Sequence, residues 1–505
     1  MKKRMFTIIT MCLLLATIST VTANASNDTI HGSQKVVIIG DDWGPAVTKT
    51  IITFDEEIIG SSLAIEDFKV REEKELSDGS RGITDRQILD VYLSDAQGNR
   101  VVGDKGYIVT LEMYVSPVIG SPFVYKAFND WCSFYELHIS LEDGVELATS
   151  NGNISVLNIN PVINLRDSTQ RVVPGADEFK LHTYTNTTSG TTLSYGEYHS
   201  TRTNNKRPLV IWLHGGGEGG TDNYITLLGN KVTALVGDEF QSLFDGANIL
   251  TPQVPTRWMD GVYGQVTSGQ VSSRYTEDLM SLIKNYVNNN PDIDKDRIII
   301  GGCSNGGYMV MEMILNYPEY FAAAFPICEA FSDTFITDEQ INTLVENDIG
   351  IWFVHALEDK IVISEQTTIP TYNRLIDAGA TNVHKSTFNE VIDTSGRFLS
   401  IDGSGPYKYS PHWVWVYFFN NECYSDVTGE NAWVWLSQQT KTGNGQQVPE
   451  PIPAPLEPPI EVTDIGTPSQ NVKTGDTVNS IVYHITLVFL SLGLVTSIKK
   501  RKTNY

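Results

Sequence analysis

The sequence predicts two folded domains, an all-β sandwich followed by an α/β domain with a mostly parallel sheet and helices on both faces. Up to about residue 165, short β-type runs alternate with turn-forming residues and show no helical periodicity. From about residue 176 to 440, apolar strand-like runs alternate with amphipathic helical patterns, which is typical of βαβ units. The length of 505 residues is sufficient for two or three domains with their own cores.

The first domain is expected over residues 32–168. Five runs rich in β-branched and aromatic residues indicate its strands: Lys35–Gly40, Thr48–Phe54, Ile88–Leu93, Tyr107–Val115 and Phe134–Ile139. Turn formers such as Asp78-Gly79 and Asp143-Gly144 separate the runs, a pattern typical of a β-sandwich. No catalytic constellation falls here, which favours a structural or packing module over a ligand-binding one.

The second domain is expected over residues 175–442. Its predicted strands are Leu209–Leu213, Arg297–Ile300, Ala322–Ile327, Ile351–His355 and Val383–Phe388. Its predicted helices are Thr276–Val287, Tyr308–Leu315, Ile369–Ala378 and a closing segment, Asn431–Gln439. Alternation of this kind predicts a largely parallel sheet that is covered on both faces.

Both ends of the chain carry targeting patterns. Residues 1–25 combine a basic start, an apolar stretch and small residues before Ser26, which predicts a secretory signal cleaved after Ala25. Residues 443–470 are rich in proline and predict an extended spacer. The apolar stretch 478–498 is long enough to span a bilayer, and the Lys499–Lys502 cluster is expected to remain cytoplasmic.

Residues 471–505 resemble a variant of the LPxTG-type sorting signal of Gram-positive surface proteins. The motif Asn471-Val472-Lys473-Thr474-Gly475 has Asn and Val where Leu and Pro usually stand, and the apolar span and basic tail follow in order. The resemblance implies cleavage between Thr474 and Gly475 and linkage to cell-wall peptidoglycan, with a membrane-anchored ectodomain as the alternative. In both cases the protein is expected to be secreted and to face outward at the cell surface.

Charge and cysteine usage exclude two classes of partner. The net charge of -24 argues against nucleic-acid binding, which needs clustered Lys and Arg. The four cysteines beyond the signal have no metal-type spacing, so no metal site is expected, and their disulfide pairing cannot be deduced from the sequence: Cys132, Cys303, Cys328 and Cys423. Cys303 and Cys328 are expected to be small buried apolar residues.

Ser304 is the predicted nucleophile. It is the centre of Gly302-Cys303-Ser304-Asn305-Gly306, between the strand Arg297–Ile300 and a helix beginning near Tyr308. A nucleophile elbow requires this context, because its tight turn leaves room only for small neighbours and presents the hydroxyl at a helix N-terminus. The alternative is an ordinary glycine turn.

The run His214–Gly220 directly follows the strand Leu209–Leu213 and contains five glycines. Backbone N–H groups on such a loop can stabilise the oxyanion of acyl transfer, and glycines allow the main chain a close approach. We assign the two donors to the N–H groups of Gly216 and Asn305, with Gly217 as the alternative to Gly216. A phosphate-binding loop is disfavoured because no Lys-Ser/Thr follows, and His214 is expected to be structural.

The predicted general base is His412, and the predicted acid is Asp359. His412 lies in a loop after the last predicted strand, whereas its competitor His384 lies within that strand. Asp359 follows the strand Ile351–His355, where a carboxylate can orient the imidazole; Glu358 is the adjacent alternative. The order Ser304, Asp359, His412 is that of α/β-hydrolases, which is the fold class predicted for the second domain.

These motifs resemble those of secreted bacterial esterases related to polyhydroxybutyrate depolymerases and feruloyl esterases. Within that group, Val36–Pro45 is similar to the start of an N-terminal immunoglobulin-like domain. The resemblance implies hydrolysis of carboxylic esters through an acyl-serine, without a metal or organic cofactor. It also implies that the N-terminal domain assists homo-oligomer assembly or shapes the mouth of the active site.

Three functions follow from the sequence. The first is an extracellular carboxylesterase acting on small-molecule or polysaccharide-linked esters. The second is a serine peptidase of the prolyl-oligopeptidase-like type, because both reactions proceed by acyl transfer. The third is a surface-binding protein with an inactive hydrolase domain. Three tryptophans are candidates for lining an acyl or aryl pocket, with a core position as the alternative: Trp258, Trp413 and Trp415.

Overall fold

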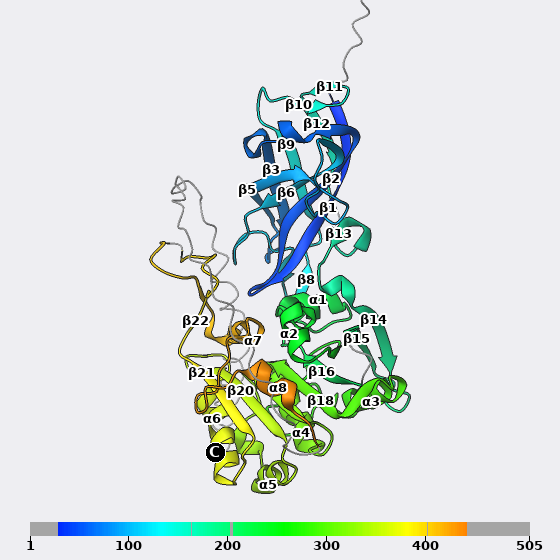
Figure 1. Cartoon of the computed structure of the whole chain (residues 1–505). Helices are drawn as coiled ribbons and strands as arrows, with labels where there is room; N and C mark the ends of the chain where they lie inside the picture. Colours follow the sequence, from blue (N-terminus) through cyan, green and yellow to red (C-terminus); the bar gives the residue numbers. More distant parts are fainter. Residues whose placement is uncertain (1–28, 163, 203–205, 401, 442–505) are drawn as a thin grey trace, which may run out of the picture.

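Two domains lie end to end in the computed structural model (Figure 1), which describes residues 29–162, 164–202, 206–400 and 402–441. The predicted signal at 1–25, the spacer 443–470 and the sorting segment 471–505, with its apolar stretch 478–498, lie outside the described residues. None of the helices within the described ranges is long and apolar enough to cross a membrane.

The N-terminal domain is built from two sheets and a short hairpin. The larger sheet contains β1 (Thr29–Asp41), β2 (Gly44–Ile59), β5 (Ile88–Leu93), β6 (Lys105–Met113), β10 (Leu147–Thr149), β11 (Gly152–Ile154), β12 (Val156–Asn160) and β13 (Arg171–Val172). The smaller sheet contains β3 (Phe68–Glu75), β4 (Arg81–Arg86) and β9 (Tyr135–Leu141), and the hairpin pairs β7 (Phe123–Tyr125) with β8 (Asn129–Trp131). The predicted β-sandwich is confirmed. Because β13 pairs with β1, the larger sheet includes residues beyond 168.

The C-terminal domain contains one eight-stranded mixed sheet. Its order is β14 (Lys180–Thr185), β15 (Thr192–Tyr198), β17 (Asn248–Gln253), β16 (Arg207–Leu213), β18 (Ile293–Cys303), β19 (Ala323–Ile327), β20 (Gly350–Ala356) and β21 (Val383–Phe388). Neighbouring strands from β17 to β21 are parallel, and β15 is antiparallel to both of its neighbours. A small separate hairpin pairs β22 (Val391–Ile392) with β23 (Lys408–Tyr409).

Helices cover both faces of this sheet, as predicted. They are α1 (Asn223–Gly229), α2 (Asp238–Leu243), α3 (Thr276–Asn289), α4 (Asn305–Asn316), α5 (Asp338–Glu346), α6 (Thr368–Asp377), α7 (Trp415–Phe419) and α8 (Ala432–Gln438). Successive side chains of a strand point to opposite faces. Leu209 and Ile211 of β16 therefore join the cluster that contains α3 to α6, whereas Val210 and Trp212 join the cluster that contains α1, α2, α7 and α8.

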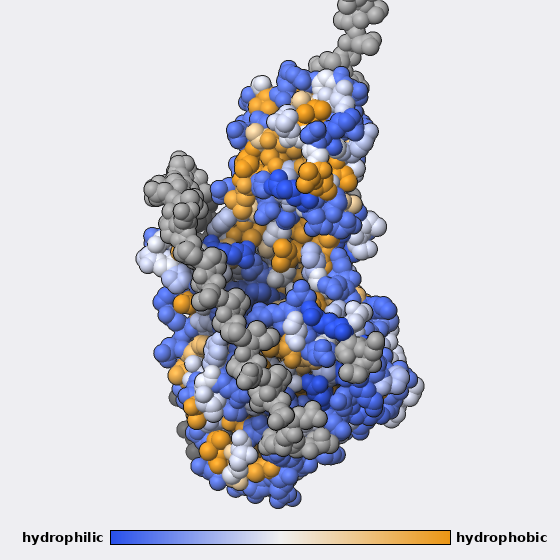
Figure 2. Space-filling model, viewed as in Figure 1, coloured by the Kyte–Doolittle hydropathy of each residue, from blue (hydrophilic) through white to orange (hydrophobic). Residues whose placement is uncertain are grey.

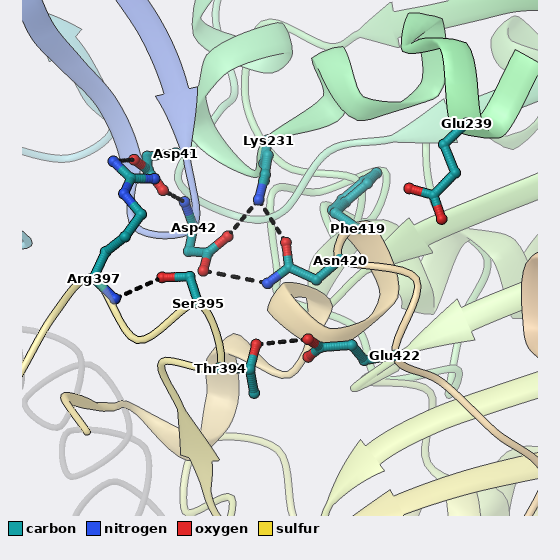
Figure 3. Close-up of a pocket in the computed structure, with 10 residues that line it drawn as sticks. All are labelled: Asp41, Asp42, Lys231, Glu239, Thr394, Ser395, Arg397, Phe419, Asn420 and Glu422. Carbon is teal, nitrogen blue, oxygen red and sulfur yellow. Dashed lines mark hydrogen bonds and ion pairs between the residues drawn. The ribbon is translucent and has the colours of Figure 1, made fainter. Parts of the chain in front are cut away.

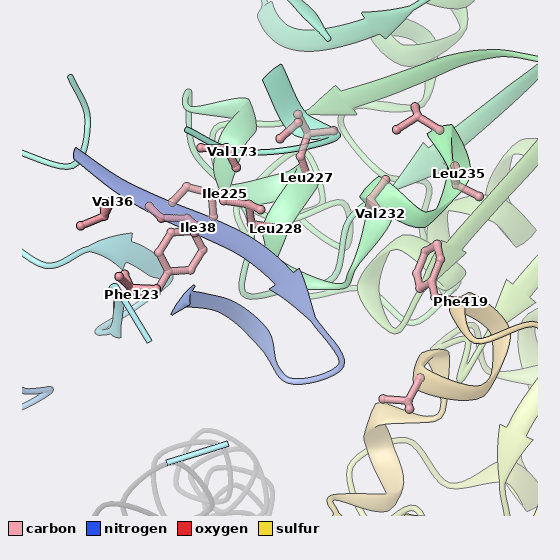
Figure 4. Packing of buried hydrophobic residues seen from close by; sticks show 14 of the residues in the cluster. Val36, Ile38, Phe123, Val173, Ile225, Leu227, Leu228, Val232, Leu235 and Phe419 are labelled. Carbon is pink, nitrogen blue, oxygen red and sulfur yellow. The ribbon is translucent and has the colours of Figure 1, made fainter. Parts of the chain in front are cut away.

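One apolar core connects the two domains. Figure 4 shows Val36 and Ile38 of β1 beside Ile225 and Leu228 of α1, and all four side chains belong to one buried cluster. Burial of large aliphatic side chains contributes about 1.5–3 kcal/mol each, so this interface resembles a domain core rather than a loose contact. The N-terminal domain is therefore held in a fixed position against the α/β domain.

Candidate active site

Ser304 lies at the sharp turn between β18 and α4. Its backbone has φ 55° and ψ -113°, which are strained values for a residue with a side chain. A Cβ atom added to Gly302 would come within 2.7 Å of the Leu213 carbonyl oxygen, and one added to Gly306 within 2.0 Å. The predicted need for small neighbours therefore has a direct steric cause. The turn exposes part of the serine side chain at the N-terminus of α4.

His412 lies within hydrogen-bonding distance of Ser304. Its Nε2 is 2.9 Å from Ser304 Oγ, although the two residues are 108 positions apart. The short turn Pro411–Trp413 carries the histidine, and the ring of Trp415 packs edge-on against it at 5.9 Å between centroids. His412 as a whole is buried.

Asp359 contacts the other nitrogen of the His412 imidazole. Its Oδ2 is 2.7 Å from His412 Nδ1, and its Oδ1 accepts the N–H groups of Ile361 at 2.8 Å and Val362 at 3.1 Å. Burial raises the pKa of this carboxyl, but hydrogen bonds from His355 and His412 outweigh burial and hold the pKa well below its ordinary value. The side chain is therefore an ionised acceptor that orients the imidazole.

The competing residues lie elsewhere. His384 is within β21, where its ring stacks on Trp352 at 4.9 Å between centroids. Glu358 is exposed and its Oε2 lies 3.1 Å from Lys360 Nζ. The structure thus brings Ser304, His412 and Asp359 together and leaves both alternatives outside the group.

The glycine-rich loop 214–220 lies beside the elbow. A Cβ added to Gly216 would be 3.7 Å from Asn305 Cβ, whereas one added to Gly217 would approach Asn129 and Tyr125 of the N-terminal domain. Within the described part of the chain, the N–H groups of Gly216 and Gly217 have no hydrogen-bond partner. The N–H of Asn305 belongs to the first turn of α4, where helix geometry provides no acceptor. Gly216 and Asn305 are thus suitably placed as a pair of donors.

His214, the first residue of the loop 214–220, is bonded to neighbouring main-chain groups. It is fully buried, and burial lowers its pKa to about 4, so the ring is neutral at physiological pH. Its Nδ1 lies 2.7 Å from the Gly215 carbonyl oxygen, and its Nε2 accepts the Val254 N–H at 3.3 Å. These contacts fit the structural role expected for this histidine.

The N-terminal domain contacts the same loop through the β7–β8 hairpin. The Asn129 N–H donates to the Gly217 carbonyl oxygen at 2.7 Å, and Asn129 Nδ2 donates to Glu218 Oε1 at 2.8 Å. Burial raises the pKa of Glu218 to about 7, although hydrogen bonds from Asn129 and the Gly215 backbone act in the opposite direction. Neither Asn129 nor Glu218 was predicted from the sequence as part of the site. The acidic residue within a run of glycines is the one signal that could have drawn attention to Glu218.

The tryptophans and cysteines are mostly core residues. Trp258 is fully buried and Trp415 is buried, whereas Trp413 is half-buried and packs against Trp415 at 6.2 Å between centroids. All four described cysteines are buried and free. Cys303 and Cys328 are thus small core residues, as expected.

Among the residues that the structure describes, two groups of side chains have possible metal-ligating atoms within 4.8 Å of one another. The first consists of Cys328, Asp359 and His412, in which the carboxylate and imidazole already bond to each other. The second consists of Glu73, Glu136 and His138. Both Arg71 and Arg81 form ion pairs with the Glu73 carboxylate. Neither group presents a set of free ligands.

A pocket of about 300 Å³ lies at the domain junction, and no residue of the Ser304 group lines it (Figure 3). The tip of the β1–β2 hairpin contributes Asp41 and Asp42. Lys231 Nζ lies 2.8 Å from Asp42 Oδ1, and Arg397 lies 3.3 Å from Asp41. Polar and charged side chains of the pocket walls thus connect the two domains, next to the apolar core of Figure 4.

Comparisons with known proteins agree with this architecture. Residues 33–194 match a family model described as an esterase Ig-like N-terminal domain, and residues 200–397 match one described as phospholipase/carboxylesterase. The chain is a serine hydrolase. The predicted arrangement of an immunoglobulin-like domain followed by an α/β-hydrolase domain is confirmed.

Solved structures resemble this hydrolase to different extents. One described as the crystal structure of a thermostable esterase has a TM-score of 0.63 at 23% identity, covering 81% of this chain and 99% of that chain. An acylaminoacyl peptidase complex has a TM-score of 0.32 at 15% identity, covering 74% and 53%. A ferulic acid esterase has a TM-score of 0.30 at 12% identity, covering 42% and 89%. No curated protein matches the sequence.

Proposed function

We propose that this serine hydrolase is an extracellular carboxylesterase that uses Ser304, His412 and Asp359 as its catalytic triad. One observation carries the proposal: Ser304 Oγ is 2.9 Å from His412 Nε2, and His412 Nδ1 is 2.7 Å from Asp359 Oδ2. Such a line lets imidazole accept the serine proton while the carboxylate stabilises the imidazolium. The match to a carboxylesterase family model over residues 200–397 supports an ester substrate.

The reaction follows from the positions of these groups. Ser304 Oγ attacks the ester carbonyl carbon as His412 Nε2 takes its proton, and the carbonyl oxygen gains negative charge. The N–H groups of Gly216 and Asn305 hydrogen-bond that oxyanion. His412 then protonates the departing alcohol, leaving an acyl group on Ser304. Water, deprotonated by His412, attacks the acyl carbon and releases the acid. No step needs a metal or an organic cofactor.

An ester panel with a peptide arm tests the proposal. The purified protein is assayed with p-nitrophenyl esters of increasing acyl length and with matched peptide p-nitroanilides. We expect ester turnover to exceed amide turnover, and we expect Ser304→Ala to abolish it without a change in melting temperature. Turnover retained by the Ser304→Ala variant rejects the triad, whereas higher activity on amides supports a peptidase. Lack of any turnover in the wild type favours the surface-binding alternative.

The extracellular location is a proposal from the chain ends. It is supported by the signal pattern at 1–25 and by the resemblance of 471–505 to a sorting signal. The free thiols are compatible with export because all four are buried. Fractionation of cells into wall, membrane and medium distinguishes wall attachment from a membrane anchor. Recovery of the protein in the cytoplasm contradicts both.

Self-association through the N-terminal domain is also proposed. Figure 2 shows apolar side chains gathered on the visible face of this domain. Its exposed apolar residues include Ile83, Leu89 and Tyr107. Apolar surface of this kind is typical of protein contact sites. Light scattering of the purified protein gives its oligomeric state, and a monomer at every concentration contradicts this proposal.

A further inference from the structure

Arg257 presents a positive charge beside the oxyanion loop. The segment that carries it follows β17 and contacts the elbow, since the backbone N–H of Trp258 donates to Asn305 Oδ1 at 2.6 Å. A Cβ added to Gly216 would lie 3.8 Å from Arg257 Nε and 3.7 Å from Asn305 Cβ. The guanidinium is therefore close to Gly216, one of the two assigned oxyanion donors.

The N-terminal domain holds this guanidinium in place. Arg257 Nη2 donates to the Ala127 carbonyl oxygen at 3.1 Å, and the group lies over the Phe128 ring with 4.7 Å to the centroid. Both partners are at the tip of the β7–β8 hairpin. A backbone carbonyl and an aromatic face fix the orientation of the group but leave its charge without a counter-ion.

No carboxylate of the described residues lies within 4.0 Å of the Arg257 nitrogens. The side chain is half-buried, so the guanidinium keeps contact with solvent at the mouth of the site. Arginine presents several donors in a planar fork that suits carboxylates. The chain as a whole carries a net charge of -24, so this cation differs in sign from the overall charge of the protein.

We infer that Arg257 forms an anion subsite, and that the natural substrate is an ester bearing a carboxylate a few bonds from the scissile carbonyl. This inference rests on the proposed esterase function. The carboxylate can belong to the acyl part, as in a hemiester of a dicarboxylic acid, or to the alcohol part, as in an ester of a hydroxy acid. In both cases, the bond to Arg257 adds to the orientation of the ester toward Ser304.

Matched ester pairs test the inference. The acyl pair is p-nitrophenyl butyrate and mono-p-nitrophenyl succinate, and the alcohol pair is methyl 4-acetoxybenzoate and 4-acetoxybenzoate, each corrected for uncatalysed hydrolysis. In at least one pair we expect kcat/KM for the anionic ester to exceed that for the neutral one by about tenfold or more. Arg257→Gln is expected to remove this preference with little loss on the neutral ester, and Arg257→Lys to retain part of it.

Arg274→Gln is the matched control, because Arg274 lies at the other end of the same loop and stacks over Tyr275. We expect this variant to keep the wild-type preference. Equal losses on both esters of a pair in Arg257→Gln assign the arginine a purely structural role and overturn the inference, as does the absence of any anion preference in the wild type. Failure on all four esters instead rejects the esterase function.

A salt titration of the wild type keeps the inference testable if the glutamine variant does not fold. Ionic contacts that remain open to solvent weaken as salt screens them. The preference is expected to shrink between about 0.05 and 0.5 M NaCl while turnover of the neutral ester stays constant. A preference that does not respond to salt contradicts an ionic contact with Arg257.

Discussion

Asn129 Nδ2, in the N-terminal domain, donates a 2.8 Å hydrogen bond to Glu218 Oε1 in the glycine-rich loop of the catalytic domain. The partners are 89 positions apart in the chain. Because the backbone N–H of Asn129 also bonds to the Gly217 carbonyl oxygen, the hairpin restrains the loop at two consecutive residues. The immunoglobulin-like domain is thus a neighbour of the proposed oxyanion donors as well as a packing partner of the α/β domain.

Loss of the Asn129 side chain is expected to lower kcat more than it raises KM. The Asn129→Ala variant removes the Asn129 hydrogen bond to the buried Glu218 carboxyl and loosens the loop, so we expect kcat to fall by roughly tenfold. Asn153→Ala is the matched control, because Asn153 makes the same kind of bond to Glu146 at an exposed position. Steady-state kinetics of the two variants provide the measurement. Equal activity of both contradicts a positioning role for Asn129.

The pKa of Glu218 makes stability depend on pH. Its pKa is about 7 in the folded protein because of burial, against an ordinary value of 4.5. Folding therefore favours the protonated form of Glu218. The contribution of this protonated carboxyl to the free energy of unfolding is fully present below about pH 4.5 and is lost as pH rises through about 7, a change of up to about 3 kcal/mol. The Glu218→Gln variant cannot titrate at this position. Between pH 5 and pH 8, the unfolding free energy of the wild type should therefore fall relative to that of the variant. Urea unfolding at the two pH values measures the difference, and identical pH slopes exclude the effect.

Asp359 and Glu358 should differ sharply in their importance for activity. Asp359→Asn replaces the acceptor that fixes the His412 tautomer, so we expect kcat to fall by about 10³–10⁴-fold. Glu358→Gln changes an exposed side chain that pairs with Lys360, and activity should remain within about twofold of the wild type. Kinetics are measured together with thermal melting of both variants. A large loss in Glu358→Gln would reassign the acid.

The four described cysteines should be inert in the native protein. Burial raises the pKa of Cys132 to about 11 and holds those of Cys303, Cys328 and Cys423 well above the ordinary value, so few thiolates form. We expect no labelling of these residues by a thiol reagent in buffer and complete labelling in denaturant, mapped by mass spectrometry. Two cysteines that label only after reduction would indicate a disulfide.

The proposed catalytic group was predictable because each member belongs to a local pattern. Ser304 follows β18 and precedes α4, Asp359 follows β20, and His412 lies beyond β21, after the β22–β23 hairpin. Because β20 and β21 are parallel, their carboxyl ends lie at the same edge of the sheet. β14 and β17 were missed for physical reasons. β14 is an edge strand with mostly exposed residues, and β17, though buried, includes Asn248, Thr251 and Gln253, so neither shows an apolar β pattern.

The interdomain part of the site could not be predicted. Asn129, Ala127 and Phe128 reach the loop 214–220 and Arg257 only because an apolar core sets the domains in one relative position. No periodicity or motif within either domain encodes that position. The raised pKa of Glu218 likewise depends on burial by residues that are distant in the chain.

The identity of the serine that a fluorophosphonate probe phosphonylates is the sharpest test of the proposed nucleophile. The wild-type protein is treated with a fluorophosphonate probe, digested, and the modified peptide is sequenced by mass spectrometry. We expect a single adduct, on Ser304, that is absent in Ser304→Ala and much slower to form in His412→Ala. An adduct on another serine, or equal labelling of Ser304→Ala, would contradict it.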